Sequence, residues 1–487
     1  METEDKSAVL AGRPHGIESA APIITGKVIG YAALILLSVA AAVTFLLLPG
    51  KFQPVMLFVF PAIVIGIWVL KNPWVGIYLF YLYNLLRPYD FIPALQPLRL
   101  AMVLEILTLI SWVIYIIRSK TSIKWSIFNW GYLGFLGVMA LGVAMAANNR
   151  MAYDTLEAML ITFIMFLIAT NVVDSLDRLN KLVWLVLLIN LYFAVQGTIN
   201  REVLHVVVRG EAASGRVGSG YIADENDFAL ALVVWVPFAF FMFQYFRSIK
   251  LKLISVFILL VFLWGVVSSM SRGGMVALMA ALLYCLLNSP NKARSLAMAF
   301  VVVLGFAAVA PGYYWHEMAS MTQTEEGTAE ERLLSWQAAG RMYLDYPVIG
   351  VGPGNGGIHF PRYIRGVSNP DRYWGRAFHG TLPQVLAEVG TVGFLFYAFM
   401  VVYAVKQLRR IKRKLPDTAD SERVGFMANS LIGGLIAYFA GATFLSTIYY
   451  PHLWILYTFI MILLHVSSQR TLLEPSTPAQ PALEKVG

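Results

Sequence analysis

The chain has 487 residues, of which 58% are hydrophobic and only 13% are charged, and its formal net charge is +9. A soluble domain carries about 25% charged residues, and a chain of this size folded in water must still cover a large surface with polar groups. The composition therefore excludes a soluble, disordered, collagen-like or disulfide-rich protein, and it predicts an all-α polytopic membrane protein.

Apolar runs long enough to cross a membrane follow one another along most of the chain. A polar stretch, 1–27, precedes them and is expected to be a disordered tail rather than a signal peptide. A spanning helix needs about 20 apolar residues. Fourteen runs qualify: 28–48, 54–70, 74–87, 101–117, 127–147, 155–173, 182–199, 227–246, 253–270, 273–288, 295–312, 389–407, 425–446 and 452–467. The third and the tenth are short enough to be re-entrant, so about 12–14 transmembrane helices are expected.

The positions of the basic residues predict which helix ends face the cytoplasm. With the first 27 residues in the cytoplasm and the sides alternating, 23 of the 37 Lys and Arg residues fall on the cytoplasmic side, as the positive-inside rule requires. The net charge is therefore a topology signal, and no nucleic-acid partner is expected. Both termini are expected in the cytoplasm, including the Pro-rich tail 468–487, which is expected to be disordered.

The external basic residues differ in type from the cytoplasmic ones. Of the 14 Lys only Lys51 falls outside, whereas 13 of the 23 Arg do. Arginine stays charged and binds phosphate through a planar fork, which lysine cannot do. The asymmetry therefore suggests a phosphate-containing ligand on the external side.

Two of the expected external loops, 201–227 and 313–388, are much longer than the other connections. Functional residues concentrate in such loops. The second is long enough for a subdomain of short helices, and 330–342 is typical of an amphipathic helix. Its apolar side would carry Leu333, Leu334, Trp336 and Ala339.

The first long loop contains Arg216 between glycines, followed by the run Asp224-Glu225-Asn226-Asp227 at the start of the eighth span. The glycines would let the backbone at Arg216 approach an anionic ligand, or would form only a flexible lead-in. The acidic run favours a capped helix, because acidic side chains and Asn suit the positive N-terminal end. A site for a hard cation is the weaker alternative, because no full ligand set is evident.

A second segment, Ser268–Gly274, lies between two apolar runs and contains Arg272. A guanidinium at membrane depth is costly unless it lines a water-filled cavity or meets an anion. Arg272 therefore favours a functional anion contact over the alternative of a charge that only marks a tight turn between helices.

The second long loop contains the other two segments of interest. The stretch from Arg332 and Trp336 to Gly350-Val-Gly352-Pro-Gly354 favours a structural loop, because no Rossmann-type strand precedes its glycines. The other segment contains His379 just before a helix that enters the membrane. A lone histidine is usually structural, but several arginines in the same loop favour a general base here.

Arg216, Arg272 and His379 share the expected external side. Two cations and one base there suggest transfer from a phosphate-linked lipid donor. The cations would stabilise a departing diphosphate, and the base would activate an acceptor hydroxyl. That side has no Asp-x-Asp motif for a metal-bound nucleotide donor, so neither a metal nor another cofactor is expected.

Taken in order, these segments resemble the bacterial O-antigen ligase and O-antigen polymerase (Wzy-type) superfamily, and in particular its ligase-like members. The matching residues lie between positions 200 and 400: Arg216 with Asn226, Ser271-Arg272-Gly273-Gly274, Arg332 with Trp336 and Gly350-Val-Gly352-Pro-Gly354, and His379 with Glu388-Val-Gly390. Each motif alone is weak, and the ordered set is fairly specific. The chain departs from the pattern at Gly380, because the family often has Asn after this histidine.

The resemblance implies an all-helical, inverting, metal-independent glycosyltransferase that uses a glycan on undecaprenyl diphosphate as its donor. The acceptor would be lipid A-core, a protein or another glycan. The diphosphate would be held by Arg216 and Arg272, and His379 would activate the acceptor. Supporting positions would be taken by Arg332, Asn226 and Glu388.

The resemblance also implies an organisation and a location. N-terminal transmembrane helices at 28–200 would be followed by a ligase-like catalytic region at 201–407 and by C-terminal transmembrane helices at 408–467. The protein would lie in the bacterial inner membrane, with its active site facing the periplasm.

Two other functions stay open at this point. A polymerase of the same superfamily would use the same donor and residue types to extend the glycan on its lipid carrier. A transporter of the bicarbonate type should show ionisable groups near the bilayer midplane. The intramembrane acids here, Glu105 and Glu157, lie near predicted helix ends and are expected to pack against polar partners. The grouping of charged candidates at one face favours the enzyme.

Overall fold

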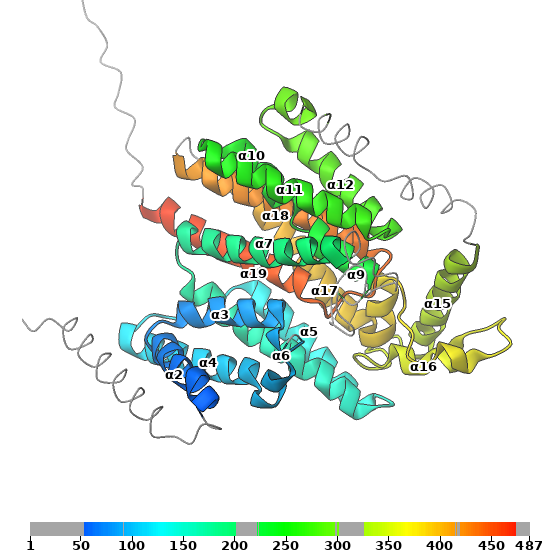
Figure 1. The fold of residues 1–487 in the computed structure, drawn as a ribbon. Helices are drawn as coiled ribbons and strands as arrows, with labels where there is room; N and C mark the ends of the chain where they lie inside the picture. Colours follow the sequence, from blue (N-terminus) through cyan, green and yellow to red (C-terminus); the bar gives the residue numbers. More distant parts are fainter. Residues whose placement is uncertain are drawn as a thin grey trace, which may run out of the picture. The chain divides into compact units, whose positions relative to one another are not determined.

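The structure is a computed structural model that describes residues 53–90, 92–200, 222, 224–297, 300, 326–413, 415 and 419–473. Within these ranges the chain forms helices and no β-strand (Figure 1). This confirms the expected all-α class. Helices suit a bilayer because each satisfies its backbone hydrogen bonds within one segment.

The chain divides into two units, 1–68 and 69–487. The described part of the first unit is the beginning of α2 (Gln53–Lys71), an apolar helix with Pro61 inside it. The α-helices of the second unit are α3 (Pro73–Leu86), α4 (Leu100–Ser119), α5 (Ile127–Met145), α6 (Asn149–Val172), α7 (Leu176–Thr198), α9 (Glu225–Val233), α10 (Val236–Tyr245), α11 (Ile249–Ser268), α12 (Arg272–Asn288), α15 (Glu326–Asp345), α16 (Gly356–Tyr363), α17 (Thr381–Arg413), α18 (Ala419–Ala442) and α19 (Pro451–Leu473). Short 3-10 helices are η2 (Pro88–Asp90), η3 (Pro93–Leu98) and η6 (Pro370–Tyr373).

The helices agree with the spans expected from hydropathy. In the described ranges, nine helical stretches are long and apolar enough to cross a membrane, and α12 is a shorter apolar helix. The expected spans 28–48 and most of 295–312 lie outside the described residues. One span, 227–246, is divided into α9 and α10 by a turn at Val234 and Trp235. Pro237 follows this turn, and a proline has no N–H with which to continue the helical hydrogen bonds.

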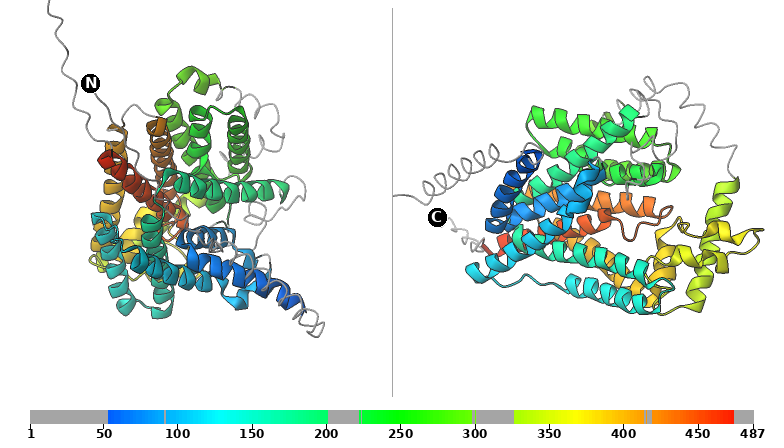
Figure 2. Two further views of the ribbon diagram at one scale, coloured as in Figure 1. Left: turned by 90° about the vertical axis from the view of Figure 1, so that its left-hand side faces the viewer. Right: turned by 60° about the horizontal axis from the view of Figure 1, so that its bottom comes forward.

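Helix α19 occupies the interior of the second unit. It packs against α6, α7, α17 and α18 (Figure 2), and its residues 452–463 are all buried. The ring of Trp454 stacks on that of Tyr132 in α5, with centroids 4.5 Å apart. Between α5 and α17, glycines allow a close approach: a Cβ on Gly131 would lie 2.6 Å from the ring of Phe399. Small residues at such contacts are typical of packed membrane helices.

The described part of the second long loop, 326–388, forms the expected subdomain of short helices. Helices α15, α16 and η6 surround a small apolar core that includes Ala339, Met342, Phe360 and Tyr373. The expected apolar side of α15 was partly wrong, because Leu333 is 53% exposed. Ala339 is buried as expected, and the buried side of this helix also includes Ser335, Ala338 and Met342.

Candidate active site

Several described segments of the expected external side meet at one end of the helices of the second unit. They are the N-terminal ends of α9, α12 and α17, the loop 443–450 between α18 and α19, and helix α15 (Figure 1). Hydrogen bonds join them in pairs, so residues far apart in the sequence form one neighbourhood.

Helix α9 begins with the cap that its acidic run predicts. The Oδ1 atom of Asp224 accepts hydrogen bonds from the backbone N–H groups of Asn226 and Asp227, both at 2.8 Å. Asp227 is only 6% exposed, and its Oδ2 accepts a hydrogen bond of 2.9 Å from the hydroxyl of Tyr450. These carboxylates are therefore engaged by groups of the protein itself.

Helix α12 begins beside α9, and Ser271 links the two. The Ser271 hydroxyl caps α12 by accepting from the N–H of Gly274 at 2.9 Å, and it donates to Asn226 Oδ1 at 2.7 Å. A Cβ on Gly274 would lie 2.4 Å from that of Ala229 in α9, so the approach of the helices requires a glycine. The capped N-terminal turns of α9 and α12 thus meet here, and helix N-termini favour anions.

Arg272 is the first residue of α12 and is half-buried. The turn that leads to it contains Met270, whose φ of 56° lies in the left-handed region. Such a conformation is disfavoured for a residue other than glycine, and it persists where surrounding contacts determine it. The backbone turn that precedes Arg272 is thus held in one conformation by its surroundings. Arg216, its expected partner, lies outside the described residues, and its position relative to Arg272 stays a prediction.

His379 lies in the turn that leads into α17, again with a left-handed backbone, at φ 53°. Its carbonyl oxygen accepts a hydrogen bond of 3.2 Å from the indole N–H of Trp336 in α15. Two residues later, the hydroxyl of Thr381 donates to the carbonyl of Leu445 at 2.6 Å and accepts from the N–H of Thr447 at 3.0 Å. The turn is therefore held by α15 on one side and by the loop 443–450 on the other.

The surroundings of His379 lower its pKa below the ordinary value. Burial is the largest cause, and the guanidinium groups of Arg332 and Arg376 act in the same direction, while Asp224 and Glu331 oppose them. These four charges also show what the imidazole faces: the cap of α9, the first described turns of α15, and Arg376 of its own loop. A lowered pKa keeps the imidazole neutral, which is the form that accepts a proton.

Arg332 connects His379 to the start of α12 through a phenylalanine. Its guanidinium carbon lies 5.9 Å from the centre of the Phe444 ring, a cation–π contact. Phe444 in turn packs against Gly273 in α12: a Cβ added to this glycine would lie 3.2 Å from the Cβ of Phe444. Arg332, Phe444 and the N-terminal turn of α12 are thus successive neighbours, so the structure brings Asn226, Arg272, Arg332 and His379 together.

Glu388 lies deeper in α17 and holds the glycine-rich loop. The side chain is 3% exposed, and its two oxygens accept from the N–H groups of Gly354 and Gly356, both at 3.2 Å. The amide of Gln384 donates to the same carboxylate at 3.4 Å. Glu388 is therefore a structural support, placed between the loop and the helix.

The same loop is inserted into a break in α17 at Gly390, which has φ 63° and ψ −166°. The N–H groups of Thr391 and Val392 donate to the carbonyls of Pro347 and Val348, at 2.8 and 3.1 Å. The carbonyls of Ala387 and Glu388, which an unbroken helix would use for those two N–H groups, accept instead from Val351 and Gly352 at 2.8 and 3.1 Å. Each interrupted helical bond is replaced by two bonds to the loop. This close approach accounts for Gly350, because a Cβ there would lie 2.5 Å from the carbonyl oxygen of Glu388. A Cβ on Gly352 would instead lie 2.7 Å from that of Ala146.

The excess of external arginines is explained in part by ion pairs within the protein. Arg376 lies 2.9 Å and Arg372 lies 3.8 Å from carboxylate oxygens of Glu331. Arg87 pairs with Asp90 at 3.1 Å, and Arg150 pairs with Asp154 at 3.0 Å. The suggestion that arginine type alone marks a phosphate ligand was therefore too broad for these four positions.

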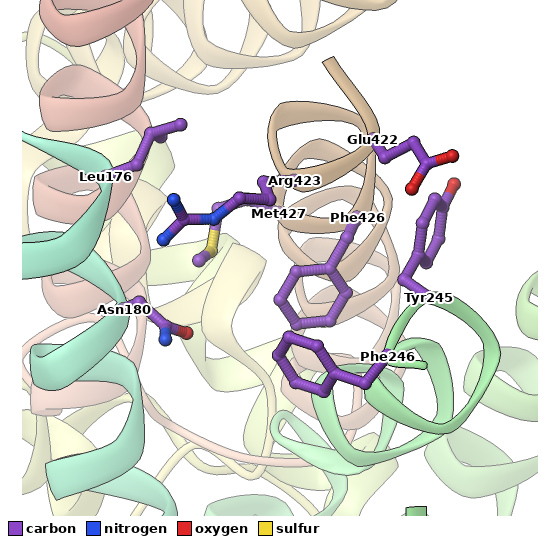
Figure 3. Close-up of a pocket in the computed structure, with 8 residues that line it drawn as sticks. All are labelled: Leu176, Asn180, Tyr245, Phe246, Glu422, Arg423, Phe426 and Met427. Carbon is purple, nitrogen blue, oxygen red and sulfur yellow. The ribbon is translucent and has the colours of Figure 1, made fainter. Parts of the chain in front are cut away.

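The opposite ends of the helices carry a separate pocket between α7, α10 and α18 (Figure 3). Its lining residues are Leu176, Asn180, Tyr245, Phe246, Glu422, Arg423, Phe426 and Met427. Arg423 is paired with Asp177 and Asp420. Among the candidate site residues that the structure describes, none lines this pocket, so it is distinct from the site above.

Several residues of the site could not be expected from the sequence. The loop 443–450 contributes Phe444, Thr447 and Tyr450, and its only sequence signal is the aromatic pair before Pro451 at the start of the last span. Glu105 and Glu157 were expected to pack against polar partners inside the membrane. Glu157 is instead exposed, and the neighbour that acts on the pKa of Glu105 is Glu157 itself.

Residues 256–398 match the family described as O-Antigen ligase, and no curated protein matches the chain. The matched range includes Arg272, Arg332, His379 and Glu388, whereas Asn226 and Arg216 precede it. The apolar helices and this family together indicate a membrane enzyme of the bacterial inner membrane. Residues 256–398 of the chain are thus similar to the O-antigen ligase family, in agreement with the resemblance that the motifs carry.

Proposed function

We propose that this protein is a membrane glycosyltransferase of the ligase type. It transfers a glycan from undecaprenyl diphosphate to a hydroxyl of lipid A-core, of a protein or of another glycan, on the periplasmic face of the membrane. The superfamily provides the general class, a ligase- or polymerase-type membrane enzyme. The donor is the one that the resemblance implies, and the residues that meet at the site support the chemistry.

In the proposed reaction, His379 takes the proton of the acceptor hydroxyl. The acceptor oxygen then attacks the anomeric carbon from the side opposite the diphosphate, and a new carbon–oxygen bond forms. The old bond to the diphosphate breaks, and its electron pair leaves with the diphosphate. One displacement of this kind inverts the configuration at the anomeric carbon.

Arg216 and Arg272 stabilise the negative charge of the departing diphosphate. Fixed cations in a partly dry site act strongly on charge that develops in the transition state, and the bidentate guanidinium suits phosphate oxygens. With this compensation supplied by side chains, the proposed step requires no metal or other cofactor. Asn226 supports Arg272 through Ser271, burial and then Arg332 lower the pKa of His379, and Glu388 anchors the loop.

The observation that carries this proposal is the meeting of a cation and a base that lie far apart in the sequence. Arg272 starts α12, His379 precedes α17, and both adjoin the same small group formed by Asp224, Arg332 and Phe444. A structural arginine at a helix turn would have no reason to share its surroundings with a half-buried histidine whose pKa is lowered.

We also propose that the chain is oriented in the membrane as its charge pattern indicates and is divided into the regions that the resemblance implies. The termini face the cytoplasm, and the region 201–407 carries the periplasmic active site between transmembrane helices at 28–200 and 408–467. Segments assigned to the cytoplasm support this by pairing with each other: Arg247 lies 3.8 Å from Glu422 at the end opposite the site.

Deletion of the gene, followed by analysis of the surface glycans, tests the proposal. A ligase predicts the loss of all long-chain glycan from the acceptor. Attachment of single units only would identify a polymerase instead. Unchanged surface glycans would overturn the enzyme altogether.

A further inference from the structure

We infer that Trp336 is a positioning residue for His379. Its indole N–H fixes the backbone of the histidine and so directs the imidazole toward the acceptor hydroxyl. This inference rests on the proposed function, in which His379 is the base.

The backbone of His379 needs outside support. A φ of 53° is a left-handed conformation, which L-residues other than glycine adopt rarely and retain only where contacts hold them there. The side chain of such a residue leaves the backbone in a direction that the extended and helical conformations do not offer. The direction of the imidazole therefore depends on whatever holds this peptide.

Trp336 supplies that contact from a different element. Its Nε1–H donates to the carbonyl oxygen of His379 at 3.2 Å. A Cβ at the next residue, Gly380, would lie only 2.8 Å from the same Nε1 atom, so the glycine is what allows the indole to reach the carbonyl. The family often has Asn at this position. In this chain Gly380 leaves the space that the indole of Trp336 occupies.

Helix α15 is well placed to act as a rigid support. Trp336 stands four residues after Arg332, so the two side chains share one face of the helix. The neighbouring face is anchored by Ala338, Ala339 and Met342 in the core of the subdomain. Arg332 influences the protonation of His379 while Trp336 holds its carbonyl, so one helix face controls both the charge and the direction of the base.

The alternative role for a half-buried tryptophan at such a site is stacking on a sugar ring. The two roles predict different kinetics. A stacking residue contributes to binding of the glycan, so its loss raises the KM. A residue that positions the base acts on the chemical step, so its loss lowers kcat and leaves the KM for the donor nearly unchanged.

The test uses the full-length protein in lipid vesicles with an undecaprenyl-diphosphate-linked glycan and its acceptor. Trp336→Phe keeps an aromatic ring and removes the N–H donor. We expect kcat to fall by about tenfold to 100-fold, the range for a misdirected catalytic group, with the donor KM within about twofold. Trp374→Phe is the matched control, because Trp374 is 65% exposed in the same subdomain, and it should behave as wild type. A rise in KM with unchanged kcat would overturn the inference.

A double substitution separates positioning from a general structural effect. In a His379→Ala background there is no imidazole to direct, so Trp336→Phe should leave the residual rate unchanged. The same fold-loss in both backgrounds would show that Trp336 acts elsewhere and would overturn the inference.

Hydrogen–deuterium exchange gives a readout that does not depend on the reaction. Trp336→Phe should accelerate exchange at residues 379–382 and leave 131–145 in α5 unchanged. Unaltered exchange at 379–382 would contradict the contact itself. Absence of glycan transfer by the wild type, with the exchange result as expected, would instead contradict the proposed function and leave the Trp336 contact standing.

Discussion

The hydroxyl of Ser271 donates a hydrogen bond of 2.7 Å to Asn226 Oδ1, across 45 residues of sequence. The same hydroxyl caps α12 by accepting from Gly274 N. One small side chain therefore fixes the N-terminus of α12 and ties it to the N-terminus of α9. Because Arg272 follows directly, this bond sets the position from which its guanidinium extends.

Removal of the Asn226 amide, which accepts this hydrogen bond, should weaken donor binding. Asn226→Ala deprives Ser271 of its acceptor, and a typical hydrogen bond contributes about 1 kcal/mol, or roughly fivefold in affinity. We expect the donor KM to rise by about that factor, measured with the protein in vesicles. Ser271→Ala should raise KM likewise and, since it also removes a helix cap worth about 1 kcal/mol, should lower the thermal unfolding midpoint. A wild-type donor KM in Asn226→Ala would contradict this role of Asn226.

Replacement of His379 by glycine should produce an enzyme that added imidazole restores. Glycine adopts a φ of 53° without strain, so the backbone is kept while the base is lost. The transfer rate should fall by about 100-fold to 10,000-fold, the usual contribution of a general base, and should recover in part with imidazole in solution. Wild type, the control, should not respond to imidazole. A loss of about twofold or less, far below that contribution, would show a structural histidine.

The pH dependence of transfer should reflect the surroundings of His379. Its pKa is lowered from the ordinary value of 6.5, first by burial and then by Arg332. A base with a lowered pKa stays deprotonated to lower pH, so the acid limb of kcat should lie below pH 6.5.

Arg332→Ala should move this limb upward, because one source of positive potential is removed. The limb should stay below the ordinary value, since burial is the larger cause and Arg376 also acts to lower the pKa, while Asp224 and Glu331 act against it. Arg294→Ala, a substitution of an exposed arginine after α12, should leave the profile unchanged. An acid limb at or above pH 6.5 in wild type would contradict a half-buried base whose pKa is lowered.

The fold was largely predictable because a bilayer imposes a local and strict rule on each spanning segment. Apolar length alone located the helices, and the acidic run at Asp224 gave the cap of α9. The division at Val234 and Trp235 was not predicted, although Pro237 marks it. Leu333 was misplaced because hydropathy cannot tell which apolar residue of an external helix meets a partner.

The site was predictable as a set of residues and not as an arrangement. Sequence order pointed to Arg272, His379 and Arg332, but their grouping depends on contacts between distant segments. The bond from Trp336 to His379 spans 43 residues, and Phe444 lies beyond all the recognised motifs. Periodicity carries no information about such pairs. The glycine at 350 is similarly explained only by the break in α17 that its loop fills, and the glycine at 352 only by the approach of Ala146.

Single-turnover transfer in vesicles tests most directly whether Arg272 stabilises the diphosphate of a lipid-linked glycan. Arg272→Ala should reduce the rate by about 100-fold or more, as removal of a group that stabilises transition-state charge does, with the protein still inserted. Arg272→Lys should recover little of this loss, because lysine keeps the charge without the planar fork. Arg294→Ala should match wild type. A wild-type rate in Arg272→Ala would contradict the account.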